Sequence, residues 1–202
     1  NAAQERELAV TLETHRRLYN DCLSGKTMCW QTAGVDWNYY DQARWLTAQR
    51  KTNKYLANLN AGSAQQTLIK LDKAFKAFFN RCKTGQNPGY PRFKSHDRFD
   101  SFAFAMTGNG GGCKIVNHKL RLQNIGTIRV RWHRELPSDA KIRQAVIKRV
   151  ADKWFICFAI ETAVVTLKTT DAQIGIDAES KLSYVIDERR RLLAEYRKAK
   201  KR

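Results

Sequence analysis

The chain has 202 residues, of which 37 are Lys or Arg and 19 are Asp or Glu, so its formal net charge is +18 at pH 7. The basic residues occur in every segment, and self-repulsion at this charge disfavours a compact state unless a polyanion neutralises it. Nucleic acid is therefore the expected partner. An anionic membrane is the weaker alternative, because the sequence contains no transmembrane span, signal peptide or long basic helix with a broad apolar face.

The hydrophobic fraction of 43% is ordinary, which predicts a folded chain with one large or two small domains. The cysteines form no C-x-x-C pair, so a zinc knuckle built from them is not expected. We expect buried, reduced thiols in a cytosolic protein. The five cysteines are Cys22, Cys29, Cys82, Cys113 and Cys157.

Residues 1–83 are predicted to be helical. Asn1 is a suitable N-cap for a first helix. The apolar stripe of this helix includes His15 as a core histidine, and Ser24-Gly25-Lys26 is predicted to end it.

Residues 28–38 are predicted as a loop, and a second helix follows over residues 39–51 with Tyr40 facing inward. Residues 58–63 form a turn in which Ser63 caps a third helix. Three helices with short connections pack as a small bundle. Three aromatic side chains are expected to pack between these helices: Trp30, Trp37 and Trp45.

A third helix is predicted over residues 64–83, and the two prolines and two glycines of residues 85–94 end it and stiffen the chain. Aromatic and basic side chains alternate there, which suits stacking on bases and pairing with phosphates. The alternative is a rigid linker with a solvated basic rim. The alternating residues are Tyr90, Arg92, Phe93 and Lys94.

Lysines recur every three residues along the third helix, at Lys70, Lys73 and Lys76, which we expect to bring them to one face. That face is either solvated or, beside the basic loop, phosphate-binding. Arg81 and Lys83 continue the basic character to the end of the helix.

The period changes to two after Pro91, which is typical of β-strands. A hairpin is predicted around Ala151-Asp152-Lys153, and short strands at this spacing indicate a barrel or a strongly bent antiparallel sheet. Basic residues alternating along residues 128–134 would face phosphates or only solvent; they are Arg129, Arg131, His133 and Arg134. The predicted strands lie within residues 102–106, 114–116, 119–122, 128–133, 141–150 and 154–161.

Residues 162–171 are predicted as a linker, residues 173–177 as a buried strand and residues 182–202 as a basic helix. Asp177 ends the buried strand, where a carboxylate could hold Mg²⁺ for metal-assisted hydrolysis. Such a site needs several carboxylates, so on residue type alone a strand-end cap is the better interpretation of Asp177. The sequence contains no P-loop, G-x-S-x-G or Rossmann fingerprint.

These features, in this order, resemble TnpB, the RNA-guided DNA endonucleases of bacterial insertion sequences that are related to type V CRISPR effectors. The resemblance covers almost all of the chain to Asp177, and its most specific part is Gly-Tyr-Pro-Arg-Phe-Lys. The residues that carry it are Asn1–Gln4, Leu18–Asn20, Gln65–Leu68, Leu71–Phe79, Gly85–Lys94, Lys119–Leu122, Ile125–Gly126, Arg129–His133 and Gly175–Asp177.

The resemblance implies an α+β fold with three parts. Residues 1–84 would be a helical recognition domain, and residues 85–170 a wedge-type antiparallel β-barrel entered through the basic loop. Residues 171–202 would begin an RNase H-like (RuvC) nuclease domain.

The resemblance also implies a guide RNA and a target double-stranded DNA as partners, with the protein holding the heteroduplex by its shape and backbone. Tyr40 and Gln65 would read a short motif beside the target, since Gln can bond adenine. Asp177 would be catalytic and would hold Mg²⁺. Tyr90 and Phe93 would stack or brace the loop, while phosphates would be held by Lys70, Lys73, Lys76, Arg81, Lys83, Arg92 and Lys94.

The chain departs from the family in several places. Glu179 stands where the family has glycine, and the second and third catalytic carboxylates are missing, as are the four-cysteine zinc site and a first strand before Asn1. We therefore expect part of a longer protein, with any zinc in its C-terminal part, in the cytoplasm of a bacterium or archaeon and associated with the nucleoid. The alternatives are a nuclease-dead RNA-guided DNA-binding repressor and a structural RNA-binding protein; monomer and dimer stay open.

Overall fold

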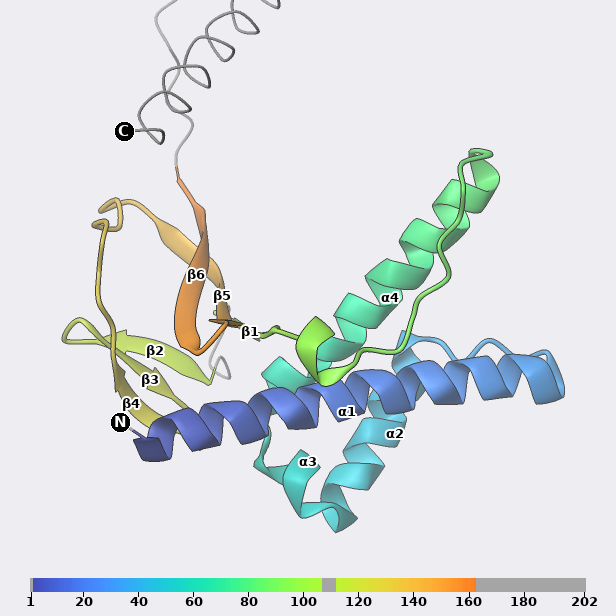
Figure 1. Cartoon of the computed structure of the whole chain (residues 1–202), viewed down its shortest axis with the longest axis horizontal. Coiled ribbons are helices and arrows are strands. Elements are labelled where there is room, and N and C mark those ends of the chain that lie inside the picture. Colours follow the sequence, from blue (N-terminus) through green and yellow to red (C-terminus); the bar gives the residue numbers. More distant parts are fainter. Residues whose placement is uncertain (1, 107–111, 163–202) are drawn as a thin grey trace, which may run out of the picture. The chain divides into compact units, whose positions relative to one another are not determined.

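A computed structural model of the chain describes residues 2–106 and 112–162, in which helices come first and strands second (Figure 1). The helices are α1 (Ala2–Ala33), α2 (Tyr39–Thr52), α3 (Lys54–Asn58) and α4 (Ala61–Lys83), with a 3-10 turn at His96–Arg98. The strands are β1 (Ser101–Ala105), β2 (Cys113–Val116), β3 (Lys119–Leu122), β4 (Gly126–Arg129), β5 (Lys141–Val150) and β6 (Lys153–Glu161). The predicted mixture of helices and antiparallel strands is confirmed.

Helix α1 runs past the predicted stop at Ser24-Gly25-Lys26 to Ala33, so much of the predicted loop is helical. Gly25 lies against the Trp37 ring, where an added Cβ would come 2.4 Å from Cζ3, so the glycine permits close packing and does not end the helix. Gly34 marks the actual end: its φ is +65° and its N–H donates to the Trp30 carbonyl at 3.0 Å.

Asparagines cap the next three helices. Asn38 caps α2 in a capping box with Asp41, and Asn53 caps α3. Asn60 caps α4, since its Oδ1 accepts a hydrogen bond from the Ser63 backbone at 2.9 Å. The prediction that Ser63 caps this helix was wrong, because Ser63 lies inside the first turn. The predicted cap Asn1 lies outside the described residues.

His15 lies in the core, as predicted, and there it joins two helices and a strand. It is fully buried, and its ring nitrogens hydrogen-bond Thr67 at 2.8 Å and Ser63 at 3.1 Å on α4. Its ring also stacks on Phe102 of β1, with centroids 5.1 Å apart. Burial, and then the charge of Lys70, lower the pKa of His15 to about 3, so the ring is neutral at pH 7.

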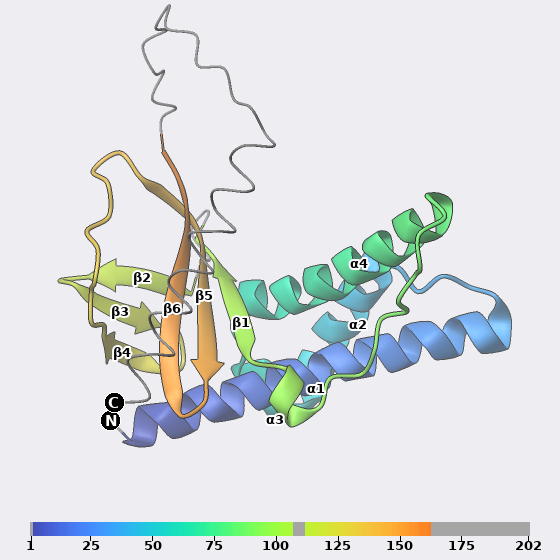
Figure 2. The ribbon, with the colours of Figure 1, turned by 45° about the horizontal axis from the view of Figure 1, so that its top comes forward.

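The strands form two antiparallel three-stranded sheets, in the orders β1-β5-β6 and β2-β3-β4 (Figure 2). The β5–β6 hairpin is confirmed, with Ala151 in the left-handed region at φ +50°. The described pairings leave the two sheets separate, so they do not close the predicted barrel. Both sheets contribute to the core, through Phe102, Phe104, Ala145 and Ile147 from the first and Cys113, Leu120 and Leu122 from the second.

Trp132 connects the two sheets. Its ring stacks on Phe158 of β6 at 5.7 Å, and its indole N–H donates to the His118 carbonyl, in the β2–β3 turn, at 2.7 Å. The chain therefore leaves β4 after Arg129, and the strand predicted to continue to residue 133 ends there.

Several predicted burials were wrong. Tyr40 is 74% exposed because α2 turns Leu46 and Gln42 inward in its place, and Trp30 is 65% exposed near the end of α1. Trp37 and Trp45 do pack together, edge to face at 5.7 Å. All five thiols are free, but only Cys22 and Cys113 are buried, whereas Cys82 and Cys157 are exposed.

Among the described residues, the helices are too short or too polar to cross a bilayer. These residues all belong to one compact unit, residues 1–163. The predicted linker, the strand that ends in Asp177 and the basic C-terminal helix fall mostly or wholly outside the described residues.

Candidate nucleic-acid interface

The basic loop after α4 turns back and runs along the helix that it leaves (Figure 1). Gly85 allows the turn with φ +67°, a conformation that glycine adopts without strain. Arg81 Nη2 then donates to the Gly89 carbonyl at 3.3 Å, and Pro91 is buried. This arrangement agrees with the stiffening expected from the prolines.

Tyr90 braces the loop against two helices. Its ring packs edge-on against Phe75 at 5.6 Å and against Phe78 at 5.3 Å, both on α4. Its hydroxyl lies 3.2 Å from Thr27 Oγ1 on α1. Of the two roles expected for Tyr90, stacking on a base or bracing the loop, these contacts fit the bracing role.

A second anchor holds the loop at Lys94. Asn20 on α1 accepts a hydrogen bond from the Lys94 N–H and donates one to its carbonyl, and Arg16 donates to the same carbonyl at 2.9 Å. Between the two anchors, Arg92 and Phe93 remain exposed. The fold thus presents a guanidinium and an aromatic ring on a backbone that is fastened on both sides.

Lys94 also takes part in a cluster that we call the lysine junction: Lys70 of α4, with Lys94 of the loop, Lys148 of β5 and Asp100 within electrostatic reach of its ammonium. The Lys148 ammonium lies 3.2 Å from Asp100 Oδ2. Lys70 Nζ lies 4.5 Å from the centre of the Phe99 ring. Three separate elements therefore bring three cations together, with one carboxylate among them, which pairs with Lys148.

The charges of the junction act on one another. Burial of its ammonium lowers the pKa of Lys70; Asp100 opposes this, while Lys94 and Lys148 lower it further. Burial raises the pKa of Asp100, but hydrogen bonds from Ser101 and Lys148 outweigh it, so that pKa lies below its usual value. Asp100 is ionised at pH 7, and the junction keeps a surplus of positive charge.

Sequence patterns missed half of this junction. Lys70 and Lys94 were predicted to bind phosphates, but Lys148 and Asp100 were not singled out. The alternation of β5 places Lys148 on a definite face, yet only the packing of α4 on β1, the strand that pairs with β5, brings that face near Lys70. The sequence alternation predicts strand β5, but no sequence pattern predicts that Lys148 comes near α4.

The predicted row of lysines on α4 does not form. Each step of three residues stops about 60° short of a full helical rotation, so Lys70, Lys73 and Lys76 fan out over the surface. Lys70 faces the junction, whereas Lys76 forms an ion pair with Asp72 at 2.7 Å. Lys73 and Lys83 are exposed on the same helix.

Tyr40 and Gln65 lie toward one side of α4. The ionisable group of Tyr40 is within electrostatic reach of Lys76. Gln65 precedes Lys76 by eleven residues, which places it on the same helix face about 16 Å away. Both side chains are exposed. A short stretch of duplex is long enough to contact both of them.

The remaining predicted residues fall into two groups. Arg129 ends β4, while Arg131, His133 and Arg134 follow in an irregular segment, and all four are exposed. They do not share the face of one strand as expected, because the chain crosses to the other sheet at Trp132. Asp177 lies outside the described residues.

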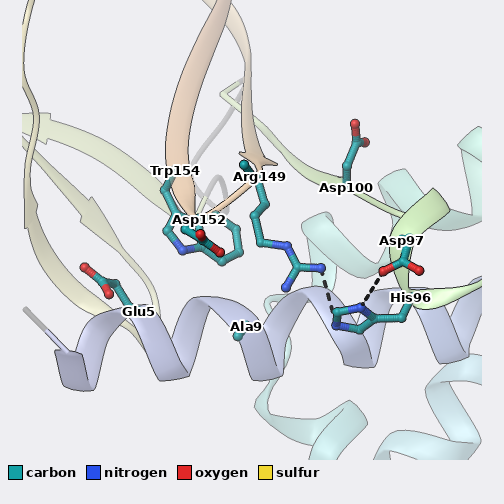
Figure 3. A pocket seen from close by; sticks show the side chains of 9 residues that line it. Glu5, Ala9, His96, Asp97, Asp100, Arg149, Asp152 and Trp154 are labelled. Atoms are coloured by element: carbon teal, nitrogen blue, oxygen red, sulfur yellow. Dashed lines mark hydrogen bonds and ion pairs between the residues drawn. The ribbon is translucent and has the colours of Figure 1, made fainter.

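A pocket of about 580 Å³ opens between α1, the His96–Arg98 turn and the β5–β6 hairpin (Figure 3). Arg149 Nη2 lies 3.3 Å from His96 Nε2, and His96 Nδ1 lies 3.2 Å from Asp97. Four carboxylates line the pocket, which disfavours a phosphate: Glu5, Asp97, Asp100 and Asp152. Within residues 2–106 and 112–162, His, Cys, Asp and Glu side chains form no group of three that could hold a metal ion.

Comparison with known proteins finds a relative in Streptomyces pristinaespiralis. A Streptomyces pristinaespiralis protein named "Putative RNA-guided DNA endonuclease" is 29% identical over 182 residues, which cover 87% of this chain and 42% of that protein. The chain thus spans less than half the length of the relative. No protein-family model matches the chain. The relative's name agrees with the function implied by the TnpB-like motifs.

Proposed function

We propose that this chain is part of a TnpB-type RNA-guided DNA endonuclease and that its described residues hold the guide RNA. The lysine junction carries the proposal, because the Lys70 ammonium has two further ammonium groups, from separate elements, within electrostatic reach and a single carboxylate, which pairs with Lys148. Phosphates of a nucleic acid would supply the missing negative charge and release counterions. The similarity to the Streptomyces protein supports an RNA-guided nuclease among the possible polyanion-binding proteins.

In this proposal the loop between the two anchors contacts RNA directly. Arg92 pairs with a phosphate, and the exposed ring of Phe93 stacks on a base. Tyr40 and Gln65, on one side of α4, read the motif beside the DNA target. The two sheets belong to the wedge-type barrel domain of that protein.

The cleavage step belongs to the whole protein. Asp177 would be one Mg²⁺ ligand there, and the ion would supply metal-assisted hydrolysis of the DNA strand. A full-length protein that binds target DNA with its guide but leaves it uncut would instead be the repressor. Equal affinity for any structured RNA, with no DNA bound through it, would indicate the structural RNA-binding protein.

The junction can be tested by changing its charge in both directions. Lys70→Ala and Lys148→Ala should each lower the slope of log K against log salt by about 0.7–0.9 for RNA that co-purifies with the protein. Asp100→Asn removes the single carboxylate and should tighten binding of the same RNA. Lys51→Ala, at an exposed position near the end of α2, is the matched control and should leave affinity nearly unchanged.

Opposite shifts from the lysine and Asp100 variants would support the junction as a phosphate site. Unchanged salt slopes in all three junction variants would remove it from the interface. If the wild-type protein binds no RNA even at low ionic strength, the proposed function itself is wrong.

A further inference from the structure

The sheet β2-β3-β4 has one buried face and one exposed face. Cys113, Leu120 and Leu122 point into the core, while the alternate residues of all three strands are exposed. Charged groups dominate the exposed face, and all of them are positive. The exposed face consists of Lys114, Val116, Lys119, Arg121, Thr127 and Arg129.

The pairing register places like charges directly opposite each other, twice. Lys114 of β2 is paired with Arg121 of β3, and Lys119 of β3 is paired with Arg129 of β4. Directly opposed side chains have Cβ atoms about 4.5–5.5 Å apart, and like charges at that separation destabilise a sheet. From Cys113 to Arg134 the sequence has six Lys or Arg and no Asp or Glu, so these three strands bring no carboxylate to relieve the repulsion.

Two ordinary explanations do not account for this face. Lysine on a sheet edge can prevent association with another strand, but Lys119 and Arg121 lie on β3, the central strand. A face that is only solvated would be as soluble with charges of mixed sign and more stable. The arrangement is unfavourable for the free protein, which points to a ligand that neutralises it.

We infer that this face, through Lys114, Lys119, Arg121 and Arg129, binds the sugar–phosphate backbone of the RNA that the protein carries. The inference rests on the proposed function and adds a second contact surface, on a different sheet from the lysine junction. A polyanion is complementary to four cations with no anion among them. RNA is the occupant because the proposed function gives the protein a guide RNA to carry.

The decisive variant is Lys119→Glu, which places a carboxylate opposite Arg129. The free protein should become more stable, with a higher Tm, because a repulsive cross-strand pair becomes attractive. Binding of co-purified RNA should weaken at the same time. Raising salt from 50 to 200 mM should weaken the variant's binding about threefold less than that of the wild type, since a phosphate contact has been lost.

Arg121→Glu, opposite Lys114, repeats the experiment on the other pair. Lys51→Glu on α2 is the control, because it changes the net charge equally at an exposed position outside the sheet. The control should keep the salt slope of the wild type. Duplex DNA of the same length, tested without RNA, separates a general polyanion effect from binding of RNA.

Each outcome decides between defined alternatives. Higher stability together with weaker RNA binding in both sheet variants supports the inference, since a purely structural role would move stability and binding in the same direction. If the wild-type protein binds RNA and both sheet variants keep its salt slope, the sheet face does not bind RNA, and the proposed function still stands. A loss confined to DNA binding overturns RNA as the occupant, and a wild-type protein that binds no RNA overturns the proposed function.

Discussion

Asn20 and Lys94 lie 74 positions apart, yet the Asn20 amide bonds to both backbone groups of Lys94 as a neighbouring strand would. Its Oδ1 accepts from the Lys94 N–H at 2.9 Å, and its Nδ2 donates to the Lys94 carbonyl at 3.0 Å. This pair fastens the end of the basic loop to α1 just before the chain enters the sheets. The position of the Lys94 side chain in the junction therefore depends on an uncharged residue of the first helix.

We expect Asn20→Ala to destabilise the protein by about 1–3 kcal/mol, because the Lys94 N–H loses its partner and the Lys94 carbonyl keeps only the bond from Arg16. Amide hydrogen exchange at Lys94 should accelerate, and RNA should bind more weakly although no charge has been removed. Asn80→Ala, at an exposed position on α4, is the control and should change neither quantity. Unaltered exchange at Lys94 would show that the loop is held by other contacts.

Tyr90 and Phe93 should respond differently to removal of their rings. Tyr90→Ala removes the contacts to Phe75 and Phe78 and should lower the free energy of unfolding by about 2–3 kcal/mol, a reduced cost because the ring is partly exposed. Phe93 is 59% exposed, so Phe93→Ala should leave stability within about 0.5 kcal/mol and weaken RNA binding. Urea unfolding and RNA titration of both variants test this. Equal losses of stability would contradict the division of roles.

Gly112 and Gly34 separate backbone strain from steric conflict. Both have positive φ, +61° and +65°, but a Cβ at Gly112 would lie 2.4 Å from Asn60 Nδ2, whereas Gly34 has open space. Gly34→Ala should cost about 1–2 kcal/mol from the left-handed backbone alone. Gly112→Ala should cost roughly 1 kcal/mol more, because Asn60 must move and weaken the cap of α4. If the two variants lower the urea midpoint equally, at equal m values, Asn60 moves aside without an energetic cost.

His15 should make stability depend on pH. Its pKa is lowered to about 3 in the fold against 6.5 in the unfolded chain, so the unfolded chain binds the proton first as pH falls. The stability contributed by His15 is present above pH 6.5 and declines between pH 6.5 and about 3, by about 1.4 kcal/mol per unit. His15→Gln lacks this titration. Between pH 7 and 5.5 the free energy of unfolding of the wild type should therefore fall by about 1.4 kcal/mol more than that of the variant. If the free energy of unfolding depends on pH equally in both proteins, the proton binds to another group.

Local periodicity determined a good part of this fold. The alternation of Phe102 and Phe104 with small residues predicts β1. The turn residues Ala151 and Asp152 predict the β5–β6 hairpin. His15 belongs to the core because it lies on an apolar stripe. These features are readable because they depend on neighbours within a few residues.

Glycines and lysines were harder to interpret. Gly25 resembles a helix end by composition, but the indole of Trp37, twelve positions away, makes it a packing site. Lys70 and Lys76 look equivalent in a three-residue repeat, and only the rotation of the helix separates them. Their surroundings differ because different elements cover the two sides of α4.

The amino-acid sequence by itself determined the surplus positive charge, the order of helices and strands, and the two-faced pattern of β2 to β4. Only the tertiary structure decided that Lys94, Lys148 and Asp100 come within electrostatic reach of Lys70, and that Lys119 stands opposite Arg129. The physical reason is that periodicity assigns a side chain to a face of its own element. Which faces then meet, and in which register, depends on packing and hydrogen bonds between segments that are distant in the chain.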